Sequence, residues 1–167
     1  MSYWCPKSQG ATSDINSTRS ILTQIMATNN EVNWSNIQKR LEMYPHEAAE
    51  VDRFNVTVLH HIIRKHINIP IDILRLLIDK YPLSLSLCDK MTGCNALHVA
   101  CGSKESDKMK DIIKLIIERR IDACRQSCFD GRLPLHKCKG VEIAKQLIDI
   151  YPEGVSVYIH TIIRKES

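Results

Sequence analysis

The sequence predicts an all-α fold made of stacked helix–turn–helix units, and three regularities of the chain indicate it. A Leu-His pair recurs with its leucines at Leu59, Leu97 and Leu135, so both intervals, 97 minus 59 and 135 minus 97, equal 38. A residue that tolerates a positive φ stands four positions before each leucine. Each pair is also followed by a segment whose apolar residues recur with a helical period. A constant interval of this length is typical of repeat architectures.

Each unit is predicted to open with a tight turn. The residues expected to adopt a positive φ are Asn55, Gly93 and Gly131. The aspartates that stand close upstream of them are Asp52, Asp89 and Asp130. Aspartate side chains accept hydrogen bonds from nearby turn amides and so favour turns. We therefore expect three similar turns, one at the start of each unit.

A short helix, a polar break and a longer helix are predicted after each turn. In the middle unit Ser106 is the expected N-cap of the longer helix, and apolar residues from Met109 to Ile117 fall at i, i+3, i+4, i+7 and i+8. This helix is expected to end at Arg119 and Arg120. The stripe is aliphatic, and aromatic residues make up only 5% of the chain. The core is therefore expected to consist of aliphatic side chains on helices.

The same short and longer helices are predicted in the other units, where different residues mark the helix ends. Pro70 suits the first helical turn of the longer helix in the first unit. A Tyr-Pro pair is expected to end a helix in three places, because proline disfavours helical geometry in the residue before it. These pairs occupy residues 44–45, 81–82 and 151–152. One such unit buries few side chains, so neighbouring units have to cover its apolar face.

The ends of the chain are predicted to be irregular. Trp34, Ile37, Leu41 and Tyr44 form a helical stripe whose partner helix is expected near residues 20–27. Near the other end, the segment 159–165 is similar to the segment 59–65 and is interpreted as a half-cap or as the start of a truncated repeat. The predicted divisions are a flexible head at 1–18, a degenerate N-terminal repeat or cap at 19–51, three repeats spanning 52–157 (52–88, 89–128 and 129–157), and a C-terminal half-cap or truncated repeat at 158–167.

These units resemble ankyrin repeats over about residues 33–157. The family pattern is G-x-T-P-L-H-x-A, and the three copies are N-V-T-V-L-H-H-I at 55–62, G-C-N-A-L-H-V-A at 93–100 and G-R-L-P-L-H-K-C at 131–138. The middle unit departs from the family in a longer break at 103–108, and Gly140 shortens the first helix of the last unit. The resemblance implies a helical repeat solenoid with short β-turn fingers, which binds a partner and performs no catalysis.

The resemblance also implies a partner-binding surface formed by the turn tips and the concave face of the inner helices. The candidates at the tips are Arg53, Phe54, Lys90, Met91, Thr92, Phe129 and Arg132. Those along the inner helices are His61, Arg64, Val99 and Lys137. The two phenylalanines either anchor a partner or shield the base of their own turns, and both interpretations stay open. The basic residues on this face favour an acidic protein partner.

The recurring histidines are interpreted as structural. By resemblance, His60, His98 and His136 bond to the backbone near a turn and link adjacent units. They share this structural motif with Leu59, Gly93, Leu97, Gly131 and Leu135. His61 and His66, which lie outside the motif, are expected at the surface.

The cysteines suggest an alternative function. Seven cysteines are an odd number, which favours reduced thiols. Cys124, Cys128, His136 and Cys138 could form a metal- or redox-responsive cluster, but Cys-x3-Cys and His-x-Cys differ from the paired loops of structural zinc sites. Cys101 and Cys138 are instead expected to pack where the inner helix contacts its neighbours. No metal and no cofactor are therefore expected.

The sequence lacks the motifs that are usual in several functional classes. The sequence contains no G-x-S-x-G, H-E-x-x-H or glycine-rich phosphate motif, so we do not expect an enzyme. A net charge of +4 without a Lys/Arg block argues against nucleic-acid binding. No apolar run suits a signal peptide or a membrane span, so a cytoplasmic or nuclear location without a membrane partner is expected. The leading hypothesis is a monomeric protein–protein interaction module or adaptor.

Overall fold

The computed structural model describes residues 19–27, 32–65 and 68–156, and this part of the chain is all-α. It contains α-helices and short 3-10 helices, and its described residues form no β-strand beyond one isolated bridge between Val51 and Thr57. The predicted head at 1–18, the predicted C-terminal segment at 158–167 and His66 lie outside the described residues.

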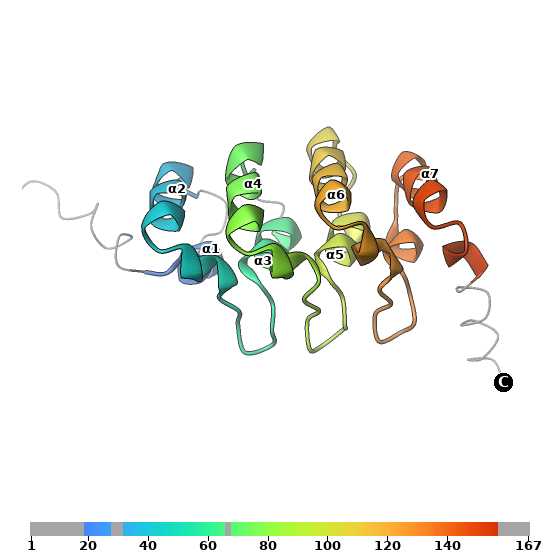
Figure 1. Ribbon diagram of the computed structural model, residues 1–167, viewed down its shortest axis with the longest axis horizontal. Helices are drawn as coiled ribbons and strands as arrows, with labels where there is room; N and C mark the ends of the chain where they lie inside the picture. Colours follow the sequence, from blue (N-terminus) through green and yellow to red (C-terminus); the bar gives the residue numbers. More distant parts are fainter. Residues whose placement is uncertain (1–18, 28–31, 66–67, 157–167) are drawn as a thin grey trace, which may run out of the picture.

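The helices follow one another as pairs along the molecule, in two rows (Figure 1). The pairs are α1 (Ile21–Ala27) with α2 (Trp34–Met43), α3 (Val58–Arg64) with α4 (Ile71–Lys80), α5 (Ala96–Gly102) with α6 (Asp107–Arg119), and η4 (Pro134–Lys137) with α7 (Val141–Ile150). In the inner row, α3 packs against both α1 and α5, and α5 packs against η4. Three loops extend from the pairs toward the same side of the molecule (Figure 1).

Helix boundaries follow the local signals of the sequence. The Ser106 hydroxyl accepts a hydrogen bond from the Met109 amide at 3.1 Å, which confirms the expected N-cap of α6. Pro70 is itself the N-cap of α4 and so stands just before the first turn rather than inside it. The tyrosine of each Tyr-Pro pair is the C-cap of the helix before it, as expected.

Short 3-10 helices are the main feature that the sequence did not predict. They follow the outer helices as η1 (Pro45–Ala49), η2 (Pro82–Leu85) and η3 (Ile121–Arg125). In η1 and η2 a proline occupies the first position, where its missing amide hydrogen would have had no partner. The inner helix of the last unit, η4, is also a short 3-10 turn, because Gly140 already caps the following helix.

The core lies between the two rows and is aliphatic, as the composition predicts. Its largest fully buried side chains are Ile21, Ile25, Ile37, Leu41, Leu59, Ile62, Ile63, Ile69, Leu74, Leu77, Ile78 and Leu85. Leu59 and Leu97 of the recurring motif are buried, whereas Leu135, in the short η4, is only partly buried. Burial of such side chains supplies most of the free energy that holds the pairs together.

Candidate partner-binding face

The three loops on one side of the molecule are called finger 1 (residues 51–57), finger 2 (residues 88–95) and finger 3 (residues 127–133). In finger 1, Oδ1 of Asp52 accepts hydrogen bonds from the amides of Phe54 at 2.8 Å and Val56 at 2.9 Å. Asn55 follows with a φ of 61°. Burial raises the pKa of Asp52, but the donating amides of Val56 and Phe54 more than offset it, so the pKa lies below its ordinary value.

Finger 2 has the same arrangement, with one more residue between the aspartate and the residue of positive φ. Oδ1 of Asp89 accepts from the amides of Met91 at 2.9 Å and Thr92 at 2.7 Å, and the Thr92 hydroxyl donates to Oδ2 at 2.6 Å. Burial raises the pKa of Asp89, whereas the bonds from Thr92 and Met91 lower it, and the net shift is downward. Gly93 then adopts a φ of 71°. The carboxylate is therefore fixed inside the turn.

Finger 3 closes without such an aspartate. The amide of Cys128 donates to the carbonyl of Arg132 at 2.9 Å, and the amide of Gly131 donates to the carbonyl of Cys128 at 2.8 Å. Gly131 has a φ of 75°. Asp130 stands inside the turn, at an exposed position, and does not take the place that Asp52 and Asp89 hold in the other fingers.

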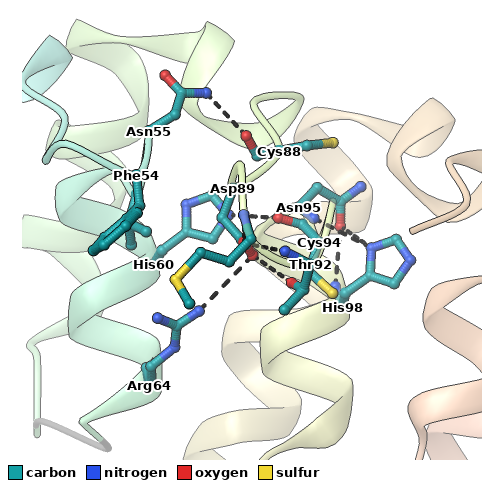
Figure 2. A network of polar contacts seen from close by, with 12 residues as sticks. Phe54, Asn55, His60, Arg64, Cys88, Asp89, Thr92, Cys94, Asn95 and His98 are labelled. Carbon is teal, nitrogen blue, oxygen red and sulfur yellow. Dashed lines mark hydrogen bonds and ion pairs between the residues drawn. The ribbon is translucent and has the colours of Figure 1, made fainter. Parts of the chain in front are cut away.

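Backbone hydrogen bonds join the fingers to one another. The amide of Lys90 donates to the carbonyl of Phe54 at 2.8 Å, and the amide of Phe129 donates to the carbonyl of Thr92 at 2.9 Å. The side-chain amide of Asn55 adds a bond to the carbonyl of Cys88 at 2.9 Å (Figure 2). These bonds fix the spacing between successive tips, so the fingers form one surface.

Two of the recurring histidines link their pair to the next. Nε2 of His60 donates to the carbonyl of Cys94 at 3.2 Å (Figure 2), and Nε2 of His98 donates to the carbonyl of Arg132 at 2.9 Å. His136 makes the corresponding bond to Gly154 at 3.0 Å. The bonds of His60 and His98 reach the following unit, which is the form that the resemblance implies, whereas His136 and Gly154 belong to the same unit. Burial lowers the pKa of His60 and of His98 to about 4, so both rings are neutral at physiological pH.

The predicted tip residues lie together on the fingers. Arg53, Lys90, Met91, Thr92, Phe129 and Arg132 are exposed, and Phe54 is half-buried. The exposed fraction reaches 65% for Met91 and 72% for Phe129, which is high for large apolar side chains. The guanidinium of Arg53 stacks 4.6 Å from the centroid of the Phe54 ring. Adjacent fingers thus present apolar and cationic groups side by side.

Phe129 was interpreted either as an anchor for a partner or as a shield for the base of its own turn, but its ring contacts the turn of the neighbouring finger. Its ring covers the backbone of Gly93 in finger 2, so a Cβ added to Gly93 would lie 2.6 Å from Cδ1 of Phe129. Phe129 therefore shields the neighbouring turn and not the base of its own. Its other face remains exposed, since most of the side chain is accessible.

Of the inner-helix candidates, one is exposed and three are half-buried. Arg64 is exposed, and Val99 and Lys137 are half-buried beside it in one hollow of about 430 Å³. His61 was expected at the surface, but it is only half-buried. Its side chain is 13% exposed and Nε2 lies 3.1 Å from Oδ2 of Asp52, because finger 1 folds back against the helix.

Two lysines of this hollow were missed by the sequence reasoning. Lys104 and Lys139 also line it and are exposed. Lys104 lies in the longer break of the middle unit, and Lys139 follows the shortened inner helix of the last unit. Both positions are departures from the family pattern, and these departures were the signal that could have drawn attention to them.

The proposed cysteine cluster does not assemble. Within residues 19–27, 32–65 and 68–156, no three His, Cys, Asp or Glu side chains are grouped to hold a metal ion. Both ring nitrogens of His136 have backbone partners, since Nδ1 accepts from the Leu133 amide at 3.0 Å and Nε2 donates to Gly154. Cys138 instead contacts Cys101, and this thiol–thiol hydrogen bond, followed by burial, raises the pKa of Cys101.

Comparisons with known proteins identify no family and no function for this face. Among the described residues, no helix combines the length and the apolar character that a bilayer crossing requires. No family model, curated protein or solved structure matches the chain.

Proposed function

We propose that the chain is an ankyrin-like repeat solenoid that acts as a protein–protein interaction module, and that it binds its partner through the finger tips and the concave face of the inner helices. It performs no catalysis, needs no cofactor and works as a monomer in the cytoplasm or nucleus. The reduced state of the described cysteines agrees with such a location, since Cys88, Cys94, Cys101, Cys124, Cys128 and Cys138 are free.

The observation that supports this proposal best is the surface formed by fingers 2 and 3. Met91 and Phe129 are large apolar side chains that remain mostly exposed, while a backbone hydrogen bond from Phe129 to Thr92 holds the two fingers in register. Exposed apolar groups on a rigid frame lose little conformational entropy when a partner covers them. Aromatic residues in such positions are common anchors of protein interfaces.

The charge of this face favours an acidic partner. Arg53, Lys90 and Arg132 are exposed on the fingers, and Arg64 and Lys137 lie on the adjoining inner row. Complementary charge accelerates association and selects among partners more than it adds affinity. An acidic partner would therefore be recognised by the cations around the apolar anchors.

A double substitution on the fingers tests the proposal. Met91→Ser with Phe129→Ser removes the exposed apolar groups of the tips. The matched control is Met43→Ser with Val141→Ser, because Met43 is 68% exposed and Val141 is 71% exposed, on the outer helices α2 and α7. Both variants are expected to retain the helical circular dichroism of the wild type.

Binding is measured by quantitative affinity capture from an extract of the cells that express the protein. Partners enriched by the wild type are expected to be lost with the finger variant and kept with the outer-helix control. If the finger variant folds and retains every enriched partner, the proposed face is wrong. If both variants lose the same partners, the loss is not specific to the fingers, and the proposal fails as well.

A further inference from the structure

We propose that the hollow beside finger 2 binds a phosphorylated side chain of the protein partner. This inference rests on the proposed function, because it names the chemical group that the same face would recognise. The hollow has a volume of about 430 Å³, within the range of roughly 300 to 1,000 Å³ that is usual for ligand pockets. It is large enough for one side chain and the backbone that bears it.

Four cations from three sequence units meet at this hollow. Arg64 lies at the end of α3, Lys104 follows α5, Lys137 ends η4 and Lys139 follows it. The residues that line the hollow include no aspartate or glutamate. His98 also lines it but adds no charge, because burial keeps the ring neutral and Nε2 already donates to the carbonyl of Arg132. The hollow is therefore strongly positive.

The charges of these cations are poorly compensated within the described part of the chain. In that part, neither Lys104 nor Lys139 forms an ion pair. The ammonium of Lys137 donates a hydrogen bond to the Cys94 thiol, 2.8 Å away. A thiol is a weak acceptor. Arg64 lies 3.9 Å from Oδ2 of Asp89, whose carboxylate is already held by the turn (Figure 2).

A phosphoryl group fits this arrangement better than a carboxylate does. Phosphoserine carries a charge of about −1.5 to −2 at neutral pH and has three strong acceptor oxygens. A carboxylate carries a single charge, which would leave most of the four cations unpaired in a partly enclosed site. Lysines that surround an anion from several directions supply charge-assisted hydrogen bonds to all three phosphate oxygens.

The position of the hollow indicates that the phosphate belongs to a protein. Thr92 lines the hollow and is also part of finger 2, next to Met91 at the tip. A segment that covers Met91 would therefore reach the hollow with its neighbouring side chains. The cations form one compact group and not an extended stripe, which fits a single phosphoryl group better than the backbone of a nucleic acid.

The test uses degenerate peptide libraries with one fixed central residue, which is phosphoserine, serine or glutamate. Binding to the full-length protein is measured by fluorescence anisotropy, with inorganic phosphate as a competitor. Lys104→Gln with Lys139→Gln removes two charges from the hollow. Lys80→Gln with Lys145→Gln removes the same charge from exposed positions on α4 and α7 and is the matched control.

The wild type is expected to bind the phosphoserine library about tenfold or more tightly than the serine or glutamate libraries, and phosphate is expected to compete. The Lys104/Lys139 variant loses this preference, whereas the Lys80/Lys145 variant keeps it. Equal binding of the three libraries overturns the proposal, and so does an equal loss in both variants. Tighter binding to vesicles that contain phosphoinositides than to any peptide also overturns it. These results leave capture through Met91 and Phe129 unaffected, so the two proposals can fail separately.

Discussion

Nε2 of His98 donates a hydrogen bond to the carbonyl of Arg132 at 2.9 Å and thereby joins the inner helix α5 to finger 3. The His98 ring is fully buried, and its Nδ1 accepts a bond from the Asn95 amide at 3.3 Å. One side chain thus satisfies backbone groups in two successive units. Such a bond ties the stability of one unit to that of the next.

We expect His98→Ala to lower the free energy of unfolding by about 3 kcal/mol, because it leaves a cavity, removes the partner of the Asn95 amide and removes one of the two donors to the Arg132 carbonyl. Urea unfolding followed by circular dichroism measures this change. His46→Ala, at an exposed position, serves as the control and is expected to change stability by less than about 0.5 kcal/mol. Similar losses for both variants would contradict a linking role for His98.

Stability is expected to fall as the pH decreases from 6.5 to about 4. Burial lowers the pKa of His60 and of His98 from 6.5 to about 4, so in this window the unfolded chain binds protons that the folded chain does not. The stability that the neutral rings provide is fully present above pH 6.5 and is lost as the pH falls to about 4. Each ring contributes up to about 3 kcal/mol to this loss.

Urea unfolding at intervals between pH 7.5 and 4.5 measures this dependence. The slope of the free energy of unfolding against pH is expected to be smaller in His98→Gln than in the wild type, because one titrating histidine is gone. Part of the slope remains, since burial also lowers the pKa of His60, His61 and His136. Asp52 and Asp89 do not produce this slope, since their pKa values lie below 3.8. An unchanged slope in His98→Gln would show that other groups titrate.

Gly93 and Phe129 are expected to be energetically coupled. Gly93→Ala introduces a side chain at a φ of 71° and brings its Cβ to 2.6 Å from the Phe129 ring. We expect a loss of about 2 kcal/mol, of which about 1 comes from the backbone conformation. In Gly93→Ala with Phe129→Ala the steric part disappears, so the double-mutant cycle gives a coupling of about 1 kcal/mol. Strict additivity of the two single changes would contradict the contact.

The extent to which sequence predicts this molecule depends on the range of the interaction. The N-cap at Ser106, the ends of helices before Pro45 and Pro82, and the positive φ of Gly93 follow from residues within one turn of chain. Each of these signals acts on its own neighbours, and the recurring interval of 38 reinforced them. The all-α fold class could therefore be predicted from sequence.

The composition of the face could be predicted only in part. Met91 and Phe129 were found because they flank recognisable turns, whereas the contact of Phe129 with Gly93 joins different units and leaves no local signal. Lys104 and Lys139 were missed because an insertion and a shortened helix bring them to one hollow. Cys138 contacts Cys101 of the preceding inner helix, where both thiols were expected to pack, and not the other residues of the alternative cluster.

Glu47 is expected to hold the two helices of the first pair together. Its carboxylate is 4% exposed, forms two bonds of 2.6 Å with the guanidinium of Arg40, and accepts from the Ile21 amide at 3.0 Å. Glu47→Ala leaves the Arg40 charge partly buried and removes the cap of α1. We expect a loss of about 3 kcal/mol, with the increase in amide hydrogen exchange concentrated in α1 and α2. Glu42→Ala, on the exposed side of α2, is the control and should cost less than about 0.5 kcal/mol. A uniform increase in exchange over all helices would show instead that the first pair does not open separately.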